Sequence, residues 1–148
     1  MSKKQDKGKK MAYSVIKKIR FDDVDGAGIV YYPQYFHLCH AAFEDFFDDA
    51  AHISYPDLIS KKRLGFPTVA VNSDFTATLV YGDIAIIKLS IKKIGKSSVV
   101  FGYRIRRKRD SELCFTADVT TVIISLDSMK PVPIPKEYRT LFKNLLET

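Results

Sequence analysis

Apolar and polar positions alternate along several stretches of the chain. In the stretch from Tyr13 to Phe21, apolar side chains such as Val15 and Ile19 fall on one face and Lys18 and Arg20 on the other, which is typical of a half-buried strand. Four further alternating runs follow at 69–79, 84–94, 99–105 and 113–126. The phase of the second of these runs slips between Ile86 and Ile87, which predicts a β-bulge there. Short turns separate these later runs, so neighbouring strands are expected to be antiparallel.

The period changes between the first strand and the others. From Gln34 to about Ala51, apolar residues recur at steps of three and four, which predicts a long helix with a wide apolar face. Pro33 suits its first turn, where a missing N–H has no partner in the helix anyway. Short helices are predicted at 55–62 and 135–146. Only a sheet is large enough to cover the aromatic face, so the predicted class is α+β, with one antiparallel five-stranded sheet wrapped around one long central helix.

The length and composition fit one folded domain. The chain has 148 residues, 46% of them apolar. Residues 1–10 are polar and lysine-rich, so a flexible basic tail is expected there, followed by a single domain over 11–148. No secretory pattern follows the tail and no apolar run approaches the roughly 18 residues of a membrane span, so a cytoplasmic location without membrane association is expected. Cys39 and Cys114 match no metal or redox spacing and are expected to be reduced, buried thiols.

The net charge of +7 raises the question of an anionic partner. The tail carries +4 of it, which leaves a modest +3 for the rest of the chain. A second basic cluster spans Arg104–Arg109. A solvated strand end with its turn is the favoured interpretation, and a patch for a CoA phosphate or a nucleic acid is the alternative; nucleic-acid binding is not expected. His37 and His40 lie three residues apart without a third ligand motif, so no metal site is expected.

One stretch combines residues that could carry chemistry. Asp22, Asp23 and Asp25 lie beside Gly26 and Gly28, immediately before the long helix. A helix N-terminus presents unpaired N–H groups that can polarise a carbonyl and stabilise an oxyanion. A nearby carboxylate could act as a nucleophile or as a base on water. Such loops are also common turn structures, so composition alone leaves both interpretations open.

One run closely resembles a known family signature: Asp23-Val24-Asp25-Gly26-Ala27-Gly28-Ile29-Val30-Tyr31-Tyr32-Pro33-Gln34-Tyr35. The family is that of the 4-hydroxybenzoyl-CoA thioesterases. That signature reads D-x-D-x-x-G-I-V, followed by aromatic residues and a Tyr near a helix start. Segments 81–83, 93–99 and 131–135 are similar to further parts of the family pattern, so the resemblance covers roughly residues 13 to 140. It implies the hot-dog fold, whose order of elements is the one predicted above.

The resemblance also implies roles for individual residues. Asp25 would act as the nucleophile, through a mixed anhydride, or as the general base for water, and the Tyr32 backbone N–H would donate to the thioester oxygen. Lys96 and Ser98 would meet the CoA phosphates, and His37 is a candidate substrate contact. No cofactor is implied, because coenzyme A belongs to the substrate.

The family resemblance further implies a partner and an assembly. The expected partner is an acyl-CoA or an acyl carrier protein, and the expected state is a homodimer or homotetramer with active sites between subunits. A hot-dog protein that binds acyl-CoA or an acyl carrier without hydrolysing it is the alternative. The acyl group itself stays open, since it depends on how Phe36, Phe43, Phe47 and Val71 pack.

Overall fold

A computed structural model describes residues 12–147 of the chain, so the expected tail at 1–10 lies outside the described residues. The elements follow in the order β1 (Tyr13–Lys18), a 3₁₀ turn η1 (Phe21–Asp23), α2 (Pro33–Asp49), α3 (Tyr55–Ser60), β2 (Leu64–Gly65), β3 (Thr68–Phe75), β4 (Ile84–Ile94), β5 (Ser98–Arg107), β6 (Leu113–Val122), β7 (Ile124–Ser125) and α4 (Lys136–Asn144). Within residues 12–147, no helix has both the length and the apolar character needed to cross a membrane.

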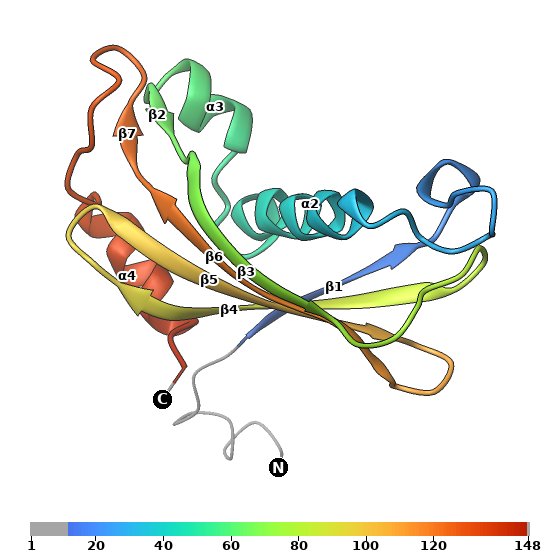
Figure 1. The fold of residues 1–148 in the computed structure, drawn as a ribbon. Helices are drawn as coiled ribbons and strands as arrows, with labels where there is room; N and C mark the ends of the chain where they lie inside the picture. The colour runs from blue at the N-terminus through green and yellow to red at the C-terminus, as the bar shows by residue number, and fades with distance from the viewer. Residues whose placement is uncertain (1–11, 148) are drawn as a thin grey trace.

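Five strands form one antiparallel sheet in the order β1-β4-β5-β6-β3. The sheet curves around α2, as Figure 1 shows. Strands β4, β5 and β6 are neighbours in sequence and in space because only short turns join them. The long connection through α2 and α3 allows β1 and β3 to take opposite edges. This arrangement confirms the predicted α+β class with a five-stranded sheet around one long helix.

Helix α2 buries the face that its periodicity predicts. Its buried side chains are Tyr35, Leu38, Cys39, Ala42, Phe43, Phe46 and Phe47. Phe43 packs edge-on against Phe101 of β5, with ring centroids 5.2 Å apart. Phe47 and Phe101 also contact Phe142 of α4. Because these aromatic side chains interlock between helix and sheet, α2 and the loop that leads into it have a fixed position over the strands.

Two strand details differ from the sequence prediction. The bulge expected between Ile86 and Ile87 is wrong, because both residues continue the regular pairing with β5; the register shifts instead between Ile91 and Lys93. Ile86 is an apolar residue on the outer face of the sheet. Such a residue interrupts the apolar–polar alternation of the sequence in the same way as a bulge would. The first strand ends at Lys18, and Phe21 is 79% exposed in the 3₁₀ turn, where we had predicted a buried strand position.

The last predicted strand, 113–126, is divided. Residues up to Val122 belong to β6, and Ile124–Ser125 form β7, which pairs with β2 in a separate two-stranded sheet. Strand β2 has only two residues, which is too short for any alternation, so no local pattern predicts this pairing.

Strand β3 is an edge strand with apolar side chains in solvent. Among residues 12–147 it pairs only with β6, and Val69, Val71 and Phe75 are 60%, 47% and 49% exposed. An edge strand of this kind offers unpaired backbone N–H and C=O groups and an apolar surface to another strand.

Candidate active site

The loop between β1 and α2 is a small closed hairpin. Val24 and Val30 form an antiparallel bridge across it. Inside the bridge, the Asp25 N–H donates to the Ile29 carbonyl at 2.9 Å, and the Gly28 N–H donates to the Asp25 carbonyl at 3.0 Å. Gly28 has φ +78°, a conformation that suits glycine and closes the turn. The sequence folds this way because Asp favours the first position of such a turn and Gly the last.

The Asp25 carboxylate is exposed and oriented by its own loop. Its Oδ1 atom accepts a hydrogen bond of 2.9 Å from the Ala27 N–H. The second oxygen accepts none from residues 12–147 and forms no ion pair with them. One carboxylate oxygen therefore holds the side chain in place while the other is free to meet a substrate or a water molecule.

Asp23 shapes the same loop, as its position suggested. Its carboxylate accepts the Arg20 N–H at 2.7 Å, and its carbonyl accepts the Tyr31 N–H at 3.0 Å. These bonds fix the two ends of the loop against each other.

Tyr32 stands at the N-cap position of α2, directly before Pro33. The N–H groups of Tyr31 and Gln34 on either side have backbone acceptors, whereas the Tyr32 N–H donates to no acceptor within the described part of the chain. It is one of the unpaired donors that every helix start presents, at the positive end of the helix dipole. The Tyr32 side chain is 62% exposed. The Asp25 turn thus lies just before a helix start that has a free donor.

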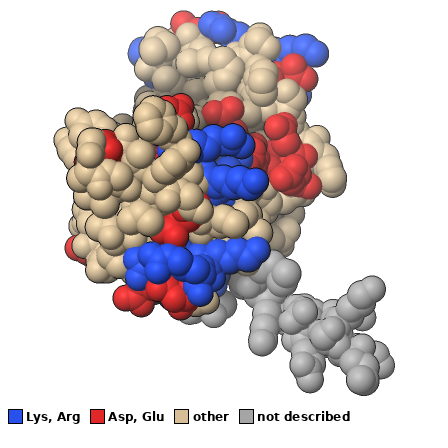
Figure 2. Space-filling view, turned by 90° about the vertical axis from the view of Figure 1, so that its right-hand side faces the viewer, with Lys and Arg blue, Asp and Glu red and all other residues tan. Residues whose placement is uncertain are grey.

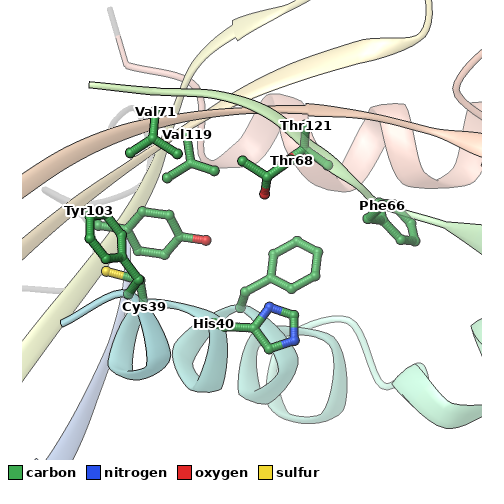
Figure 3. A pocket seen from close by; sticks show the side chains of 10 residues that line it. Cys39, His40, Phe66, Thr68, Val71, Tyr103, Val119 and Thr121 are labelled. Carbon is green, nitrogen blue, oxygen red and sulfur yellow. The ribbon is translucent and has the colours of Figure 1, made fainter. Parts of the chain in front are cut away.

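An apolar cavity of about 200 Å³ opens between α2 and the strands. Its lining residues are Phe36, Cys39, His40, Phe43, Phe66, Thr68, Val71, Tyr103, Val119 and Thr121. Figure 3 shows His40 on the helix side of the cavity and Thr68 on the strand side. Burial raises the pKa of the Cys39 thiol and that of the Tyr103 hydroxyl, so both groups stay protonated and neutral at this wall. A cavity lined mostly by apolar and aromatic side chains suits an uncharged organic group.

His40 is the polar residue of the cavity that sequence reasoning did not select. Its Nε2 atom lies 2.9 Å from Glu44 Oε2, and its ring stacks on Phe43 at 5.6 Å. His37, the histidine proposed as a substrate contact, is exposed on α2 and is not part of the cavity wall. The spacing of four residues between His40 and Glu44 was the signal that could have identified the pair, since such residues are neighbours on one helix face.

The β4–β5 turn carries Lys96 and Ser98. The Gly95 N–H donates to the Ser98 carbonyl at 2.7 Å, and the Lys96 side chain is exposed. Arg139 of α4 donates to the carbonyls of Gly95 and Lys96 at 2.9 and 3.3 Å. Sequence reasoning missed Arg139, because only the fold brings α4 next to this turn. It adds a guanidinium beside the turn that carries Lys96.

The basic cluster at the end of β5 is partly engaged within the protein. Figure 2, which looks onto the right-hand end of the molecule in Figure 1, shows Lys and Arg side chains gathered beside Asp and Glu side chains. Arg107 pairs with Asp110, and Arg109 pairs with Asp83. These contacts support the interpretation of a strand end and turn, and they leave fewer free cations for an external anion.

Comparison with known proteins gives a consistent picture. The sequence model of the thioesterase-like superfamily matches residues 19–142. A 1,4-dihydroxy-2-naphthoyl-CoA hydrolase from Synechocystis is 29% identical over 129 residues, which is 87% of this chain and 93% of that protein. The crystal structure of a 1,4-dihydroxy-2-naphthoyl-CoA thioesterase from Synechocystis superimposes with a TM-score of 0.83 at 27% identity, covering 91% of this chain and 98% of the other. A 4-hydroxybenzoyl-CoA thioesterase variant complexed with 4-hydroxybenzoyl-CoA has a TM-score of 0.79 at 26% identity, covering 88% and 97% of the two chains.

Proposed function

This chain belongs to the thioesterase-like superfamily, and from that premise we propose that it is a thioesterase that hydrolyses acyl-CoA with Asp25 as its central carboxylate. The observation that carries the assignment of Asp25 is the turn described above. It holds one carboxylate oxygen on the Ala27 N–H and leaves the other free, close in sequence to the unpaired Tyr32 N–H at the start of α2.

The proposed chemistry needs only these two groups and water. The Tyr32 N–H donates a hydrogen bond to the thioester oxygen and stabilises the negative charge that develops on it as the carbonyl carbon becomes tetrahedral. In one route Asp25 takes a proton from water, the hydroxide adds to the carbon, and the C–S bond breaks to release CoA thiolate, which takes up the proton. In the other route Asp25 itself attacks, the thiolate leaves, and water then hydrolyses the mixed anhydride.

The acyl group and the CoA phosphates of the substrate are assigned to two further parts of the same fold. We assign the acyl group to the apolar cavity between α2 and the sheet, because its mostly apolar walls would desolvate an uncharged group. The CoA phosphates are assigned to the β4–β5 turn with Lys96, Ser98 and Arg139, where cations and hydroxyls lie together. His37 remains a predicted contact for the outer part of the substrate on the exposed side of α2.

The edge strand supports a dimer. Pairing of β3 with the β3 of a second copy would satisfy its backbone groups and cover Val69, Val71 and Phe75. Antiparallel pairing about a two-fold axis would bring the Phe75 end of one strand to the Thr68 end of the other. Because Thr68 and Val71 line the cavity, each cavity would then lie beside the partner subunit, and a complete site would need two chains.

A direct test compares wild type with Asp25→Asn and Asp22→Asn. Asp22 is an exposed carboxylate of the same segment and forms no hydrogen bond within residues 12–147, so it is a matched control. Release of free thiol from short, long and aromatic acyl-CoA esters, and from an acylated carrier protein, measures hydrolysis. We expect turnover by wild type and by Asp22→Asn, and a loss of at least about a hundredfold in Asp25→Asn.

The same experiment addresses the alternative of a non-catalytic binder. Wild-type protein that binds CoA esters but releases no thiol from any of them would refute the enzymatic assignment. Label in Asp25 after a single turnover in ¹⁸O-labelled water would identify the nucleophilic route, because only attack of water on the Asp25 carbon of the mixed anhydride places it there.

A further inference from the structure

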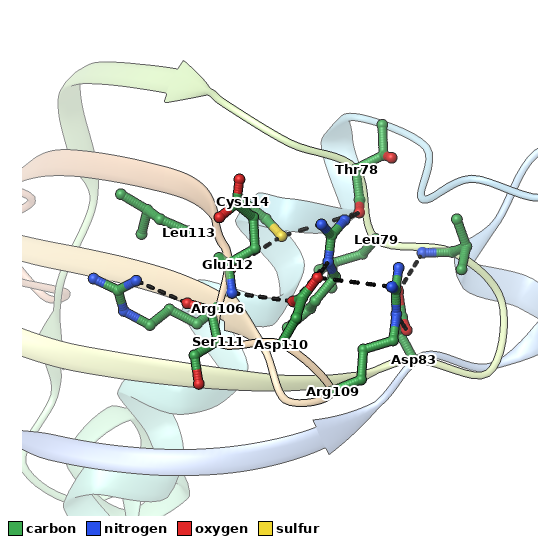
Figure 4. Close-up of polar contacts among 12 residues, drawn as sticks. Thr78, Leu79, Asp83, Arg106, Arg109, Asp110, Ser111, Glu112, Leu113 and Cys114 are labelled. Carbon is green, nitrogen blue, oxygen red and sulfur yellow. Dashed lines mark hydrogen bonds and ion pairs between the residues drawn. The ribbon is translucent and has the colours of Figure 1, made fainter.

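A cluster of two guanidinium groups and two carboxylates lies next to the segment that precedes β4. It consists of Asp83, Arg107, Arg109 and Asp110, and we call it the Arg–Asp cluster (Figure 4). Arg109 Nε donates to Asp83 Oδ1 at 2.8 Å. Arg107 Nε donates to both carboxylate oxygens of Asp110 at 3.0 Å. Arg109 Nη1 lies 3.7 Å from Asp110 Oδ2 and so connects the two pairs.

The Asp83 carboxylate is the buried member of the cluster, with its residue only 7% exposed. Burial alone would raise the pKa of this carboxyl, but the hydrogen bonds from Arg109 and from the Val80 N–H outweigh burial, and the pKa is lowered. Asp83 is therefore a charged, fully engaged group and not a spare acid. A buried charge held in this way resists displacement, because moving it would leave it unpaired.

The cluster holds the backbone from Thr78 to Asp83. Asp83 Oδ2 accepts the Val80 N–H at 3.0 Å, and Arg107 Nη1 donates to the Thr78 carbonyl at 2.7 Å. The hydroxyl of Tyr35 on α2 accepts the Leu79 N–H at 3.2 Å. The side chains of Arg107 from β5 and Tyr35 from α2, together with that of Asp83 at the end of the segment, thus fix a stretch that has no regular strand pairing of its own.

This segment in turn holds the catalytic loop. Ile29 and Val80 form an antiparallel bridge. On either side of it, the Val30 N–H donates to the Leu79 carbonyl at 2.9 Å, and the Tyr81 N–H donates to the Gly28 carbonyl at 3.0 Å. The Asp25 turn itself is exposed, so its outer side has no comparable support within residues 12–147.

We propose that the Arg–Asp cluster positions Asp25, with Asp83 and Arg109 as positioning residues that act through the Thr78–Asp83 segment. The proposal rests on the catalytic role assigned to Asp25 above. Loss of the cluster releases the segment, and the turn between Gly28 and Asp25 then samples orientations that are unproductive. Since small displacements of a catalytic group reduce turnover steeply, kcat falls while substrate contacts elsewhere persist.

The test uses a graded set of variants. Asp83→Ala removes the acceptor for both Arg109 and Val80; Asp83→Asn keeps an oxygen for Val80; Arg109→Gln removes the exposed partner alone. Arg63→Gln is the matched control, because Arg63 forms an ion pair of the same kind with Asp127, at 3.0 Å and on the surface. We expect kcat to fall about tenfold in Asp83→Ala and less in the other two cluster variants, with KM within about twofold of wild type.

A second measurement does not depend on catalysis. Amide hydrogen exchange at Val30 and Tyr81 should speed up in Asp83→Ala and Arg109→Gln and stay unchanged in Arg63→Gln. The proposal is overturned if exchange and kcat in Arg109→Gln match the control, or if KM rises as much as kcat falls. If Asp25→Asn keeps full activity, the proposed function fails, and faster exchange in the cluster variants would still demonstrate the hold on the loop.

Discussion

Gly28 allows the strain in the Asp25 turn to be measured separately from steric clash. A Cβ added at Gly28 would meet no other atom within 4 Å, and the same is true at Gly26, two residues earlier. Of these two glycines, only Gly28 has a positive φ, of +78°. Gly28→Ala and Gly26→Ala therefore differ in backbone strain alone, which makes Gly26→Ala the matched control.

The expected magnitude follows from the left-handed backbone. An L-residue in that region costs about 1–2 kcal/mol. If the fold keeps the turn in place, this destabilisation lowers the melting temperature by about 2–8 °C for a chain of this size. If the turn relaxes instead, its productive conformation becomes about 5- to 30-fold less populated, and kcat falls by up to that factor. Gly28→Asn should lose less than Gly28→Ala, because Asn tolerates positive φ better.

Melting temperature and kcat, measured on wild type and all three variants, test whether backbone strain at Gly28 is the cause of the loss. We expect Gly26→Ala to match wild type, Gly28→Asn to be intermediate and Gly28→Ala to be most affected in the two quantities taken together. Equal losses in Gly26→Ala and Gly28→Ala would refute the explanation by backbone strain.

Three further predictions concern charge, cavity and assembly. Because the folded-state pKa of Asp83 is lowered, its contribution to stability is present above its unfolded pKa of about 3.9 and is lost as pH falls through the folded value. Thermal unfolding from pH 7 to pH 3 should therefore show a smaller acid loss in Asp83→Asn than in wild type. His40→Ala should raise KM severalfold for acyl groups that carry a ring hydroxyl and much less for the unsubstituted ester, in thiol-release kinetics on the two esters, because the imidazole is a polar group in the cavity wall that can hydrogen-bond a hydroxyl. Val69→Lys should shift sedimentation equilibrium toward the monomer and reduce activity in parallel, whereas Lys130→Gln, an exposed change away from β3, should do neither.

Much of the fold is encoded in local pattern. The three- and four-residue recurrence of Phe43, Phe46 and Phe47 predicts α2 closely, because one wide apolar stripe has a single solution when a sheet covers it. The alternation along β5 is equally clear. Phe21 was misplaced because the rule that aromatic residues are buried fails in an exposed turn next to Tyr81, whose ring centroid lies 6.0 Å away.

The candidate site also has a part that the local sequence predicts and a part that it does not. The Asp25 turn could be predicted because its geometry depends on residues close in sequence, and Asp and Gly have fixed preferences there. Arg139 and the partners of Asp83 could not, because each acquires its role from an element distant in the chain. Arg109 looked like part of a solvated basic run, and only the fold shows that it points back to a buried carboxylate.

The walls of the apolar cavity share no residue with the hydrogen bonds that frame the Asp25 turn. Side chains such as Val71, Val119 or Thr121 can therefore change without disturbing the Asp25 turn. If the cavity holds the acyl group, as proposed, a duplicated gene could exchange its acyl preference through a few substitutions in one wall while the Asp25 turn stays unchanged. A directed-evolution library confined to those positions should yield altered selectivity at a high proportion of active variants.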